Sequence, residues 1–251
     1  MTGIDTVARV PEPSLGLVLL LGSAVLVGAL VQGSVGFGIV VVAAPFVIWA
    51  APELMPGSML VVGFVMPLLQ ITTRLEDVDW SSLRAALAGR LLLTPVGVWV
   101  VAVSSPRLIA LMVGVLVLVV AVASAYGPAF APRPRNLFLA GTLTGISGTS
   151  AAVGGPFVAM TLQHDEPARI RATLAAFFTV GSAFSMAGLA VVGELPREQL
   201  WWGVLLVPFL VVGYALSGPV VRRLDAGLMR TAMLWFCIVA ALSIILRAAV
   251  A

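Results

Sequence analysis

Six long apolar runs recur along this sequence, and each has the length that a helix needs to cross a lipid bilayer. A hydrocarbon core of about 30 Å requires about 20 apolar residues in a helix. Only 10% of the 251 residues are charged and 61% are hydrophobic, too few polar side chains to cover a water-exposed surface. The sequence therefore predicts an all-α polytopic membrane protein with lipid as its main solvent. The runs cover residues 53–73, 82–103, 106–126, 168–192, 198–221 and 226–249.

Two further apolar regions are interrupted near their middles by glycine-rich segments. Residues 15–50 are broken at 33–38, and residues 136–163 are broken at 145–156. The second region is too short for two full crossings, so we expect a hairpin of short helices there. The first region is long enough for either a hairpin or full crossings.

The order of these segments repeats along the chain. After a tail at 1–14, a broken hairpin and three spans fill 15–126. A polar, proline-rich linker at 127–135 then leads to a second broken hairpin and three spans in 136–251. Each glycine segment is also followed by Pro-Phe, at Pro45-Phe46 and at Pro156-Phe157. We interpret this order as an internal repeat.

Arginine provides all 14 basic residues and marks the expected topology. Arginine-rich connections alternate with arginine-poor ones, and cytoplasmic loops carry the excess of positive charge. This alternation predicts that both termini are extracytoplasmic and that the repeats are inverted, as in secondary transporters. The arginines are too scattered to form a nucleic-acid-binding face, so we expect no nucleic-acid partner. The rich connections hold Arg74 and Arg84, Arg133 and Arg135, Arg169 and Arg171, and Arg222, Arg223 and Arg230.

The glycine breaks are the candidate binding site. A helix that stops inside a membrane leaves backbone groups unpaired, which is tolerated only inside protein or at a watery cavity. A restarting helix directs its N–H groups and its positive dipole end into that space, which suits an anion. Close glycine packing between helices is the competing interpretation. We expect an anion between the hairpins, at Gln32, Gly33, Ser34, Gly36, Gly38, Ser147, Gly148, Thr149, Ser150, Gly154, Gly155 and Pro156.

Arg90 is the ionisable residue farthest from a loop within the predicted spans. A charge inside a membrane is a functional hypothesis by default, so Arg90 joins the predicted anion site. The alternative is that its long side chain extends to the cytoplasmic interface. Asp and Glu all fall at connections, which argues against a buried carboxylate proton relay. With one histidine and one cysteine in the chain, we expect no metal and no cofactor.

A short motif raises an enzymatic alternative. Residues 145–148 match the Gly-x-Ser-Gly pattern of intramembrane serine proteases, which would make Ser147 a nucleophile. The only histidine, His164, follows 17 residues later at the predicted membrane edge, which is a poor position for the required base. We therefore expect that the protein is not an enzyme.

Several of these segments together resemble the TauE/SafE sulfite exporter family over residues 15–246. The resemblance implies two homologous halves that move sulfite, sulfonates or related small anions across the bacterial inner membrane. The substrate stays open, because Gly38 is not followed by a further glycine and Phe157 stands where a second proline is frequent. A passive anion channel is the second hypothesis, and a homo-oligomer stays possible. The segments are 32–38 with Pro45, 77–80 with Gly89 and Gly97, and 145–148 with 154–156.

Overall fold

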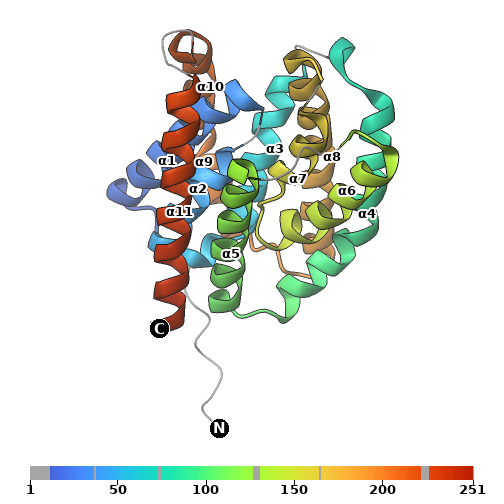
Figure 1. Ribbon diagram of the computed structural model, residues 1–251. Coiled ribbons are helices and arrows are strands. Elements are labelled where there is room, and N and C mark those ends of the chain that lie inside the picture. The colour runs from blue at the N-terminus through green and yellow to red at the C-terminus, as the bar shows by residue number, and fades with distance from the viewer. Residues whose placement is uncertain are drawn as a thin grey trace.

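The computed structural model describes residues 12–36, 38–72, 75–126, 131–163, 165–221 and 226–250, and throughout them the ordered elements are helices (Figure 1). The helices are α1 (Leu15–Val35), α2 (Ile39–Ala50), α3 (Gly57–Ile71), α4 (Trp80–Val103), α5 (Pro106–Tyr126), α6 (Pro134–Ser150), α7 (Gly155–Leu162), α8 (Pro167–Val191), α9 (Arg197–Leu205), α10 (Val207–Val221) and α11 (Ala226–Val250). Short 3-10 turns at Pro52–Leu54 and Leu75–Asp77 precede α3 and α4. The all-α membrane fold is confirmed.

Local sequence signals explain where several helices begin. Pro106, Pro134 and Pro167 are the first residues of α5, α6 and α8, where the missing proline N–H is not needed. Asp79 caps α4, because its carboxylate accepts hydrogen bonds from the N–H groups of Ser81 and Ser82. These caps place the helix starts close to the predicted span boundaries.

The predicted spans correspond to α3, α4, α5, α8, the pair α9 and α10, and α11. Two of them differ in detail. The span predicted at 53–73 begins as α3 only at Gly57, after the 3-10 turn and Pro56. The span predicted at 198–221 is interrupted at Leu206, because Pro208 has no N–H to bond the carbonyl of Val204. Within the residues that the structure describes, four helical stretches are long and apolar enough to cross a bilayer, namely Leu15–Gly33, Trp80–Val103, Pro167–Val191 and Arg197–Gly218.

Both glycine-rich regions form hairpins. In the first, the full-length α1 ends at Gly36, whose φ of 94° closes the helix, and the 12-residue α2 restarts after Gly38. In the second, α6 ends at Ser150 and the eight-residue α7 restarts at Gly155. The second region therefore forms the expected hairpin of short helices, with 17 and 8 residues. In the first region, which the sequence left open, α1 is as long as a complete span and α2 is short.

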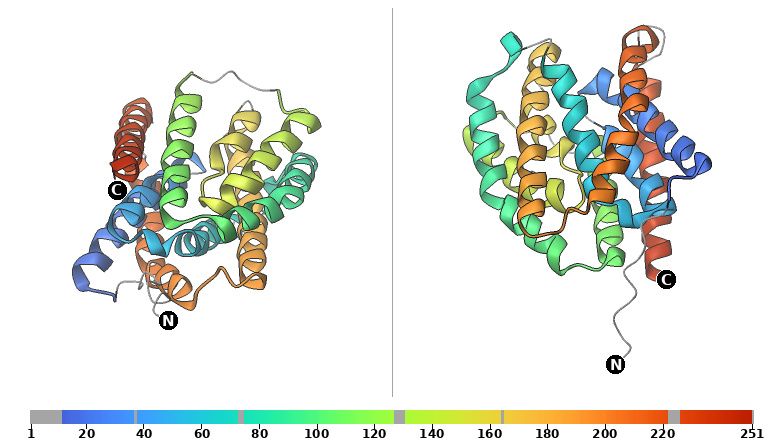
Figure 2. Two further views of the ribbon diagram at one scale, coloured as in Figure 1. Left: turned by 90° about the horizontal axis from the view of Figure 1, so that it is seen from below. Right: turned by 180° about the vertical axis from the view of Figure 1, so that it is seen from behind.

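The two halves of the chain pack against each other through matching pairs of helices. In Figures 1 and 2, α4 and α6 lie on one flank and α1 and α10 on the other. Each pair is parallel. In the first pair, Gly89 contacts Phe138 and Gly97, further along α4, contacts Gly145, further along α6. In the second pair, contacts that lie further along α1 likewise lie further along α10. Each flank thus pairs one helix from the first part of the chain with one from the second part, in parallel.

Helices at matching positions in the two halves run in opposite directions. In the middle of the molecule Gly63 of α3 lies beside Ser182 of α8, and Gly57 at the start of α3 lies beside Leu195, just beyond the end of α8. At the periphery Arg107, at the start of α5, donates a 2.7 Å hydrogen bond to the carbonyl of Ala248, near the end of α11. Both pairs, α3 with α8 and α5 with α11, are therefore antiparallel.

Arginines are divided unevenly between the two ends of this bundle. Because α4, α6 and α8 run parallel, they begin at one end, and the described arginines near those starts are Arg84, Arg133, Arg135, Arg169 and Arg171. The opposite end has Arg107, Arg197 and Arg247. We call the first of these the arginine-rich end.

Candidate functional site

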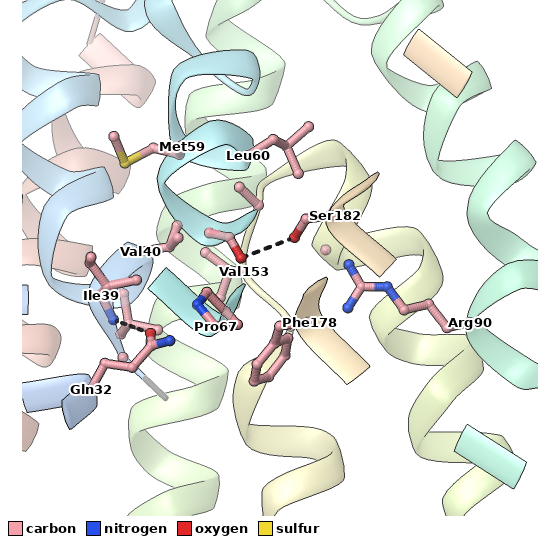
Figure 3. Close-up of a pocket in the computed structure, with 16 residues that line it drawn as sticks. Gln32, Ile39, Val40, Met59, Leu60, Pro67, Arg90, Val153, Phe178 and Ser182 are labelled. Atoms are coloured by element: carbon pink, nitrogen blue, oxygen red, sulfur yellow. Dashed lines mark hydrogen bonds between the residues drawn. The ribbon is translucent and has the colours of Figure 1, made fainter. Parts of the chain in front are cut away.

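A small cavity lies at mid-height in the bundle, where both broken hairpins meet α3, α4 and α8 (Figure 3). Its lining includes Gly63 of α3, Arg90 of α4 and Ser182 of α8, each near the middle of its helix. The centres of water molecules can occupy about 40 Å³ of this cavity, which is room for roughly three water molecules. From the hairpins come Gln32, Gly38, Ile39, Val40 and Val41 on one side, and Gly148, Ala152, Val153 and Gly154 on the other.

Arg90 is the only charged residue among those that line this cavity. Its side chain is 2% exposed, and its guanidinium lies 4.9 Å from the ring centroid of Phe177. Figure 3 shows the side chain extending from α4 toward the cavity rather than along the helix toward an end of the bundle. In this conformation Arg90 does not extend to the interface, which was the alternative that the sequence left open.

The charge of Arg90 has no counter-ion in the part of the chain that the structure describes. Its Nε and Nη1 atoms are buried without a hydrogen-bond partner, and the buried polar side chains there include no carboxylate. A buried charge with unsatisfied donors destabilises a fold unless something pairs with it. The guanidinium therefore presents two nitrogen atoms, with three N–H donors between them, that have no acceptor in an apolar setting beside a cavity.

The first hairpin contributes the start of a helix to the same cavity. Val40 and Val41 lie in the first turn of α2, where backbone N–H groups have no carbonyl of their own helix to bond. The N–H of Ile39 donates a 3.1 Å hydrogen bond to Oε1 of Gln32, so a side-chain carbonyl already acts as acceptor here. The beginning of α2 thus adds a positive dipole end to the charge of Arg90.

The second hairpin approaches the cavity from the opposite side. Thr144 Oγ1 lies 2.8 Å from the carbonyl of Ala140 and 3.1 Å from that of Gly154, which ties the start of α7 back to α6. Ala152 takes a positive φ of 55°, uncommon for a residue with a side chain. Gly148 of α6 lies close to the guanidinium, since a Cβ there would be in contact with Arg90 Nη2 at 3.4 Å.

Similarity to known protein families gives a second line of evidence on this chain. The family model described as Sulfite exporter TauE/SafE matches residues 20–244, nearly the whole chain. The chain belongs to the TauE/SafE family. No curated protein and no solved structure matches it. In this TauE/SafE protein, then, the family assignment and the cavity rest on separate observations, one from the sequence and the other from packing.

Five of the residues predicted for the anion site line one cavity: Gln32, Gly38, Arg90, Gly148 and Gly154. Gly33 borders a different cavity, and Gly36 is buried against Arg171. The surroundings of Ser34, Gly155 and Pro156 lie outside the described residues, although all three belong to helices.

The three hydroxyl residues predicted as donors do not line the cavity. Ser147, Thr149 and Ser150 are buried in α6, and each hydroxyl bonds the carbonyl four residues earlier at 2.8 to 2.9 Å. Thr149 also bonds Ser185 of α8 at 2.8 Å. A hydroxyl has one hydrogen to donate. In this arrangement the hydroxyl hydrogens are used in hydrogen bonds within the protein, so none is left to donate to an anion.

Glycines 141 and 145 of α6 serve helix packing, which was the competing interpretation of the glycine-rich segment. A Cβ at Gly145 would lie 2.5 Å from the carbonyl of Arg90, and a Cβ at Gly141 would overlap the carbonyl of Ala86. Close approach of α6 and α4 requires both glycines. In this TauE/SafE protein the segment 141–154 therefore combines a packing surface with part of the cavity wall.

Residues of α3 and α8 were missing from the predicted site. Gly63, Phe178 and Ser182 line the cavity, and Gly181 makes space for Arg90. Nothing in their local sequence distinguishes them from packing residues. Comparison of the two halves would have helped, because Gly63 and Gly181-Ser182 lie near the middle of corresponding spans.

The protease hypothesis finds no support in the geometry of Ser147. Its hydroxyl donates a 2.9 Å hydrogen bond to the carbonyl of Leu143. The base that the hypothesis requires, His164, lies outside the described residues.

Proposed function

We propose that this TauE/SafE family member transports a small sulfur-containing oxyanion, such as sulfite or a short sulfonate, and binds it beside Arg90. One observation carries the proposal: a buried arginine with two unpartnered nitrogen atoms, Nε and Nη1, lines a cavity at mid-height in a membrane bundle. An oxyanion would supply both the missing negative charge and the missing acceptors.

The cavity favours a small anion that binds with moderate strength. Arg90 provides one full charge, and the start of α2 adds backbone N–H groups without a second charge. A transporter needs such a balance, because a more strongly charged site would hold its cargo too tightly to release it. Room for roughly three water molecules suits one sulfur atom with its oxygens better than a long organic chain.

We also propose that the two halves are inverted repeats that work by alternating access. The antiparallel relation of α3 to α8 and of α5 to α11 supports this, as does the parallel packing in both flanks. In such transporters the substrate site lies near the bilayer midplane, between repeats and at discontinuous helices. The cavity occupies the corresponding place, between the breaks that follow α1 and α6.

The arginine-rich end is proposed to face the cytoplasm, across a bacterial inner membrane. Helices α1, α9 and α10 run toward that end, and α11 runs away from it, so both chain ends then belong to the extracytoplasmic side. Export of the anion would begin at the arginine-rich end.

The test is flux into proteoliposomes that contain the purified protein. We expect sulfite or a short sulfonate to move with saturable kinetics, and Arg90→Gln to lose the flux at normal insertion. A panel of labelled sulfite, organosulfonates and small carboxylates identifies the class of cargo. If no anion in the panel moves faster than in protein-free vesicles, the proposed function is wrong.

The same vesicles distinguish a carrier from a passive channel. The channel stays a candidate because the buried polar side chains of the described residues include no carboxylate to couple transport to protons. Flux of a coupled carrier responds to an imposed pH gradient. A channel would show flux that follows only the anion gradient and the membrane potential.

A further inference from the structure

A second and larger cavity opens between four helix ends at the arginine-rich end. It is bordered by the last turns of α1 and α3, by the second half of α10 and by the beginning of α8. The centres of water molecules can occupy about 300 Å³ of this outer cavity, a far larger volume than in the central cavity. Its wall carries the polar side chains of Gln70, Arg171, Tyr214 and Ser217, with Gly33 and Gly218 between them.

One pair of glutamines separates the two cavities. Gln32 lines the central cavity and Gln70 lines the outer one. Gln32 Nε2 donates to Gln70 Oε1 at 3.3 Å, and Gln70 Nε2 donates to the backbone carbonyl of Gln32 at 3.4 Å. The side chains are 3% and 6% exposed, so this buried pair connects the lining of one cavity directly to the lining of the other.

We propose that the outer cavity is a second anion-binding site, the station at which a small oxyanion is held before it passes the Gln32–Gln70 pair into the central cavity. This inference rests on the proposed function. Arg171 supplies the positive charge of the outer site, and the hydroxyl and amide groups of its wall supply exchangeable hydrogen bonds. Two weakly charged sites in series favour passage over trapping.

The position of Gln32 connects occupancy of the central site with the Gln32–Gln70 pair. Its Oε1 accepts from Ile39 N–H, at the helix start where the oxyanion is proposed to bind. An anion oxygen that takes this N–H releases the Gln32 amide from its place. Gly36, in the left-handed conformation at φ 94°, follows Gln32 by one turn and lies against Arg171, so the same segment borders both sites.

A charged thiol reagent tests the outer site directly. The chain has one cysteine, Cys237, and its replacement by serine leaves a cysteine-free background. Gly218→Cys adds a probe to the cavity wall without a clash, because a Cβ there meets nothing within 4 Å. The probe is labelled in inside-out vesicles with sulfonatoethyl methanethiosulfonate and, separately, with its cationic trimethylammonium analogue. Ala131→Cys, an exposed residue just before α6 at the same end, is the matched control.

We expect the anionic reagent to label Gly218→Cys faster than the cationic one, by on the order of tenfold. Arg171→Gln should remove that preference. Methanesulfonate, a short sulfonate that does not react with the thiol reagents as sulfite would, should slow the anionic labelling even when Arg90→Gln is also present. Neither Arg171→Gln nor the added anion should alter the labelling rate of Ala131→Cys. Equal rates for the two reagents, or a preference that survives Arg171→Gln, would overturn the proposal.

Failure of this inference can be told apart from failure of the proposed function. Suppose that wild-type vesicles move sulfite or a short sulfonate, that Arg171→Gln leaves this flux unchanged, and that methanesulfonate gives no protection at Gly218→Cys. The outer site is then absent and the central one stands. If wild-type vesicles move no anion, the proposed function itself is wrong.

Discussion

The guanidinium group of Arg90 occupies the space that a side chain at Gly181 would need. A Cβ built on Gly181 of α8 would overlap Nε and Cζ of Arg90, which extends across from α4. The charge can therefore lie in the middle of the bundle only because α8 has no side chain at this position. Phe177, one turn earlier on α8, places its ring 4.9 Å from the same guanidinium.

Gly181→Ala is expected to displace Arg90 and to weaken anion binding. Loss of one charge-assisted hydrogen bond reduces affinity by about tenfold or more. Binding of sulfite to the purified protein, by calorimetry, measures the effect. Gly16→Ala is the control, since a Cβ at Gly16 meets nothing within 4 Å. Unchanged affinity in Gly181→Ala would show that the position of the guanidinium does not matter for binding.

Arg90→Met is expected to abolish anion binding without lowering thermal stability. Methionine fills a similar volume and removes an uncompensated buried charge, a change that is often neutral or stabilising. Sulfite should raise the melting temperature of the wild-type protein, by about 2.7 kcal/mol of stability at 100 times Kd, and should leave Arg90→Met unaffected. A large drop in the melting temperature of Arg90→Met without ligand would instead indicate a structural arginine.

Gly36→Ala is expected to impair transport while the protein still inserts. At φ 94° an L side chain is strained by about 1 to 2 kcal/mol, and the new Cβ would lie 3.1 Å from Cγ of Arg171. The break after α1 should shift, and with it Gln32 and the start of α2. Sulfite flux per inserted molecule is the measurement, and full flux would mean that the hairpin tolerates another geometry.

Asp79 makes the cap of α4 sensitive to acid. A hydrogen bond from the Ser82 side chain, with others from Ser81, lowers the pKa of Asp79 from 3.8 to about 2 against the opposing effect of burial. Because the folded-state pKa is the lower one, ionised Asp79 stabilises the protein above pH 3.8, and this contribution disappears as the pH falls through about 2.

Replacement of the cap tests this assignment. Asp79→Ala should lower stability by about 1 kcal/mol at neutral pH. Asp79→Asn keeps a capping oxygen, so it should preserve most of the stability and lose the pH dependence in this range. Thermal unfolding of the detergent-solubilised protein from neutral to acid pH compares the three. The same acid sensitivity in Asp79→Asn would assign it to another group.

Both chain ends are expected on the extracytoplasmic side. The prediction follows from the uneven division of arginines and from the direction of α1 and α11. Single cysteines at Thr2 and at Ala251, in the Cys237→Ser background, are labelled in intact cells with an impermeant reagent. Protection of either end would change the number of crossings in that half and contradict the inverted-repeat proposal.

Hydrophobic periodicity and length were enough to predict most helices of this protein. The runs at 82–103, 106–126 and 168–192 match α4, α5 and α8 within two residues at each end. The errors occur where proline acts on the backbone, at Pro56 before α3 and at Pro208 after Leu206. These departures depend on which carbonyl loses its donor, a detail that average hydropathy does not contain.

The sequence by itself determined the lipid-facing composition, the two glycine breaks and the depth of Arg90 along its helix, because each depends on residue type and spacing alone. Only the tertiary structure decided which of these features meet. Arg90 can lie beside the cavity because Gly181, on another helix, leaves room for its guanidinium. In contrast, the polar hydroxyls of Ser147, Thr149 and Ser150 donate their hydrogen bonds to carbonyls of their own helix. Burial and pairing are properties of three-dimensional neighbours, so residues of similar chemistry took different places.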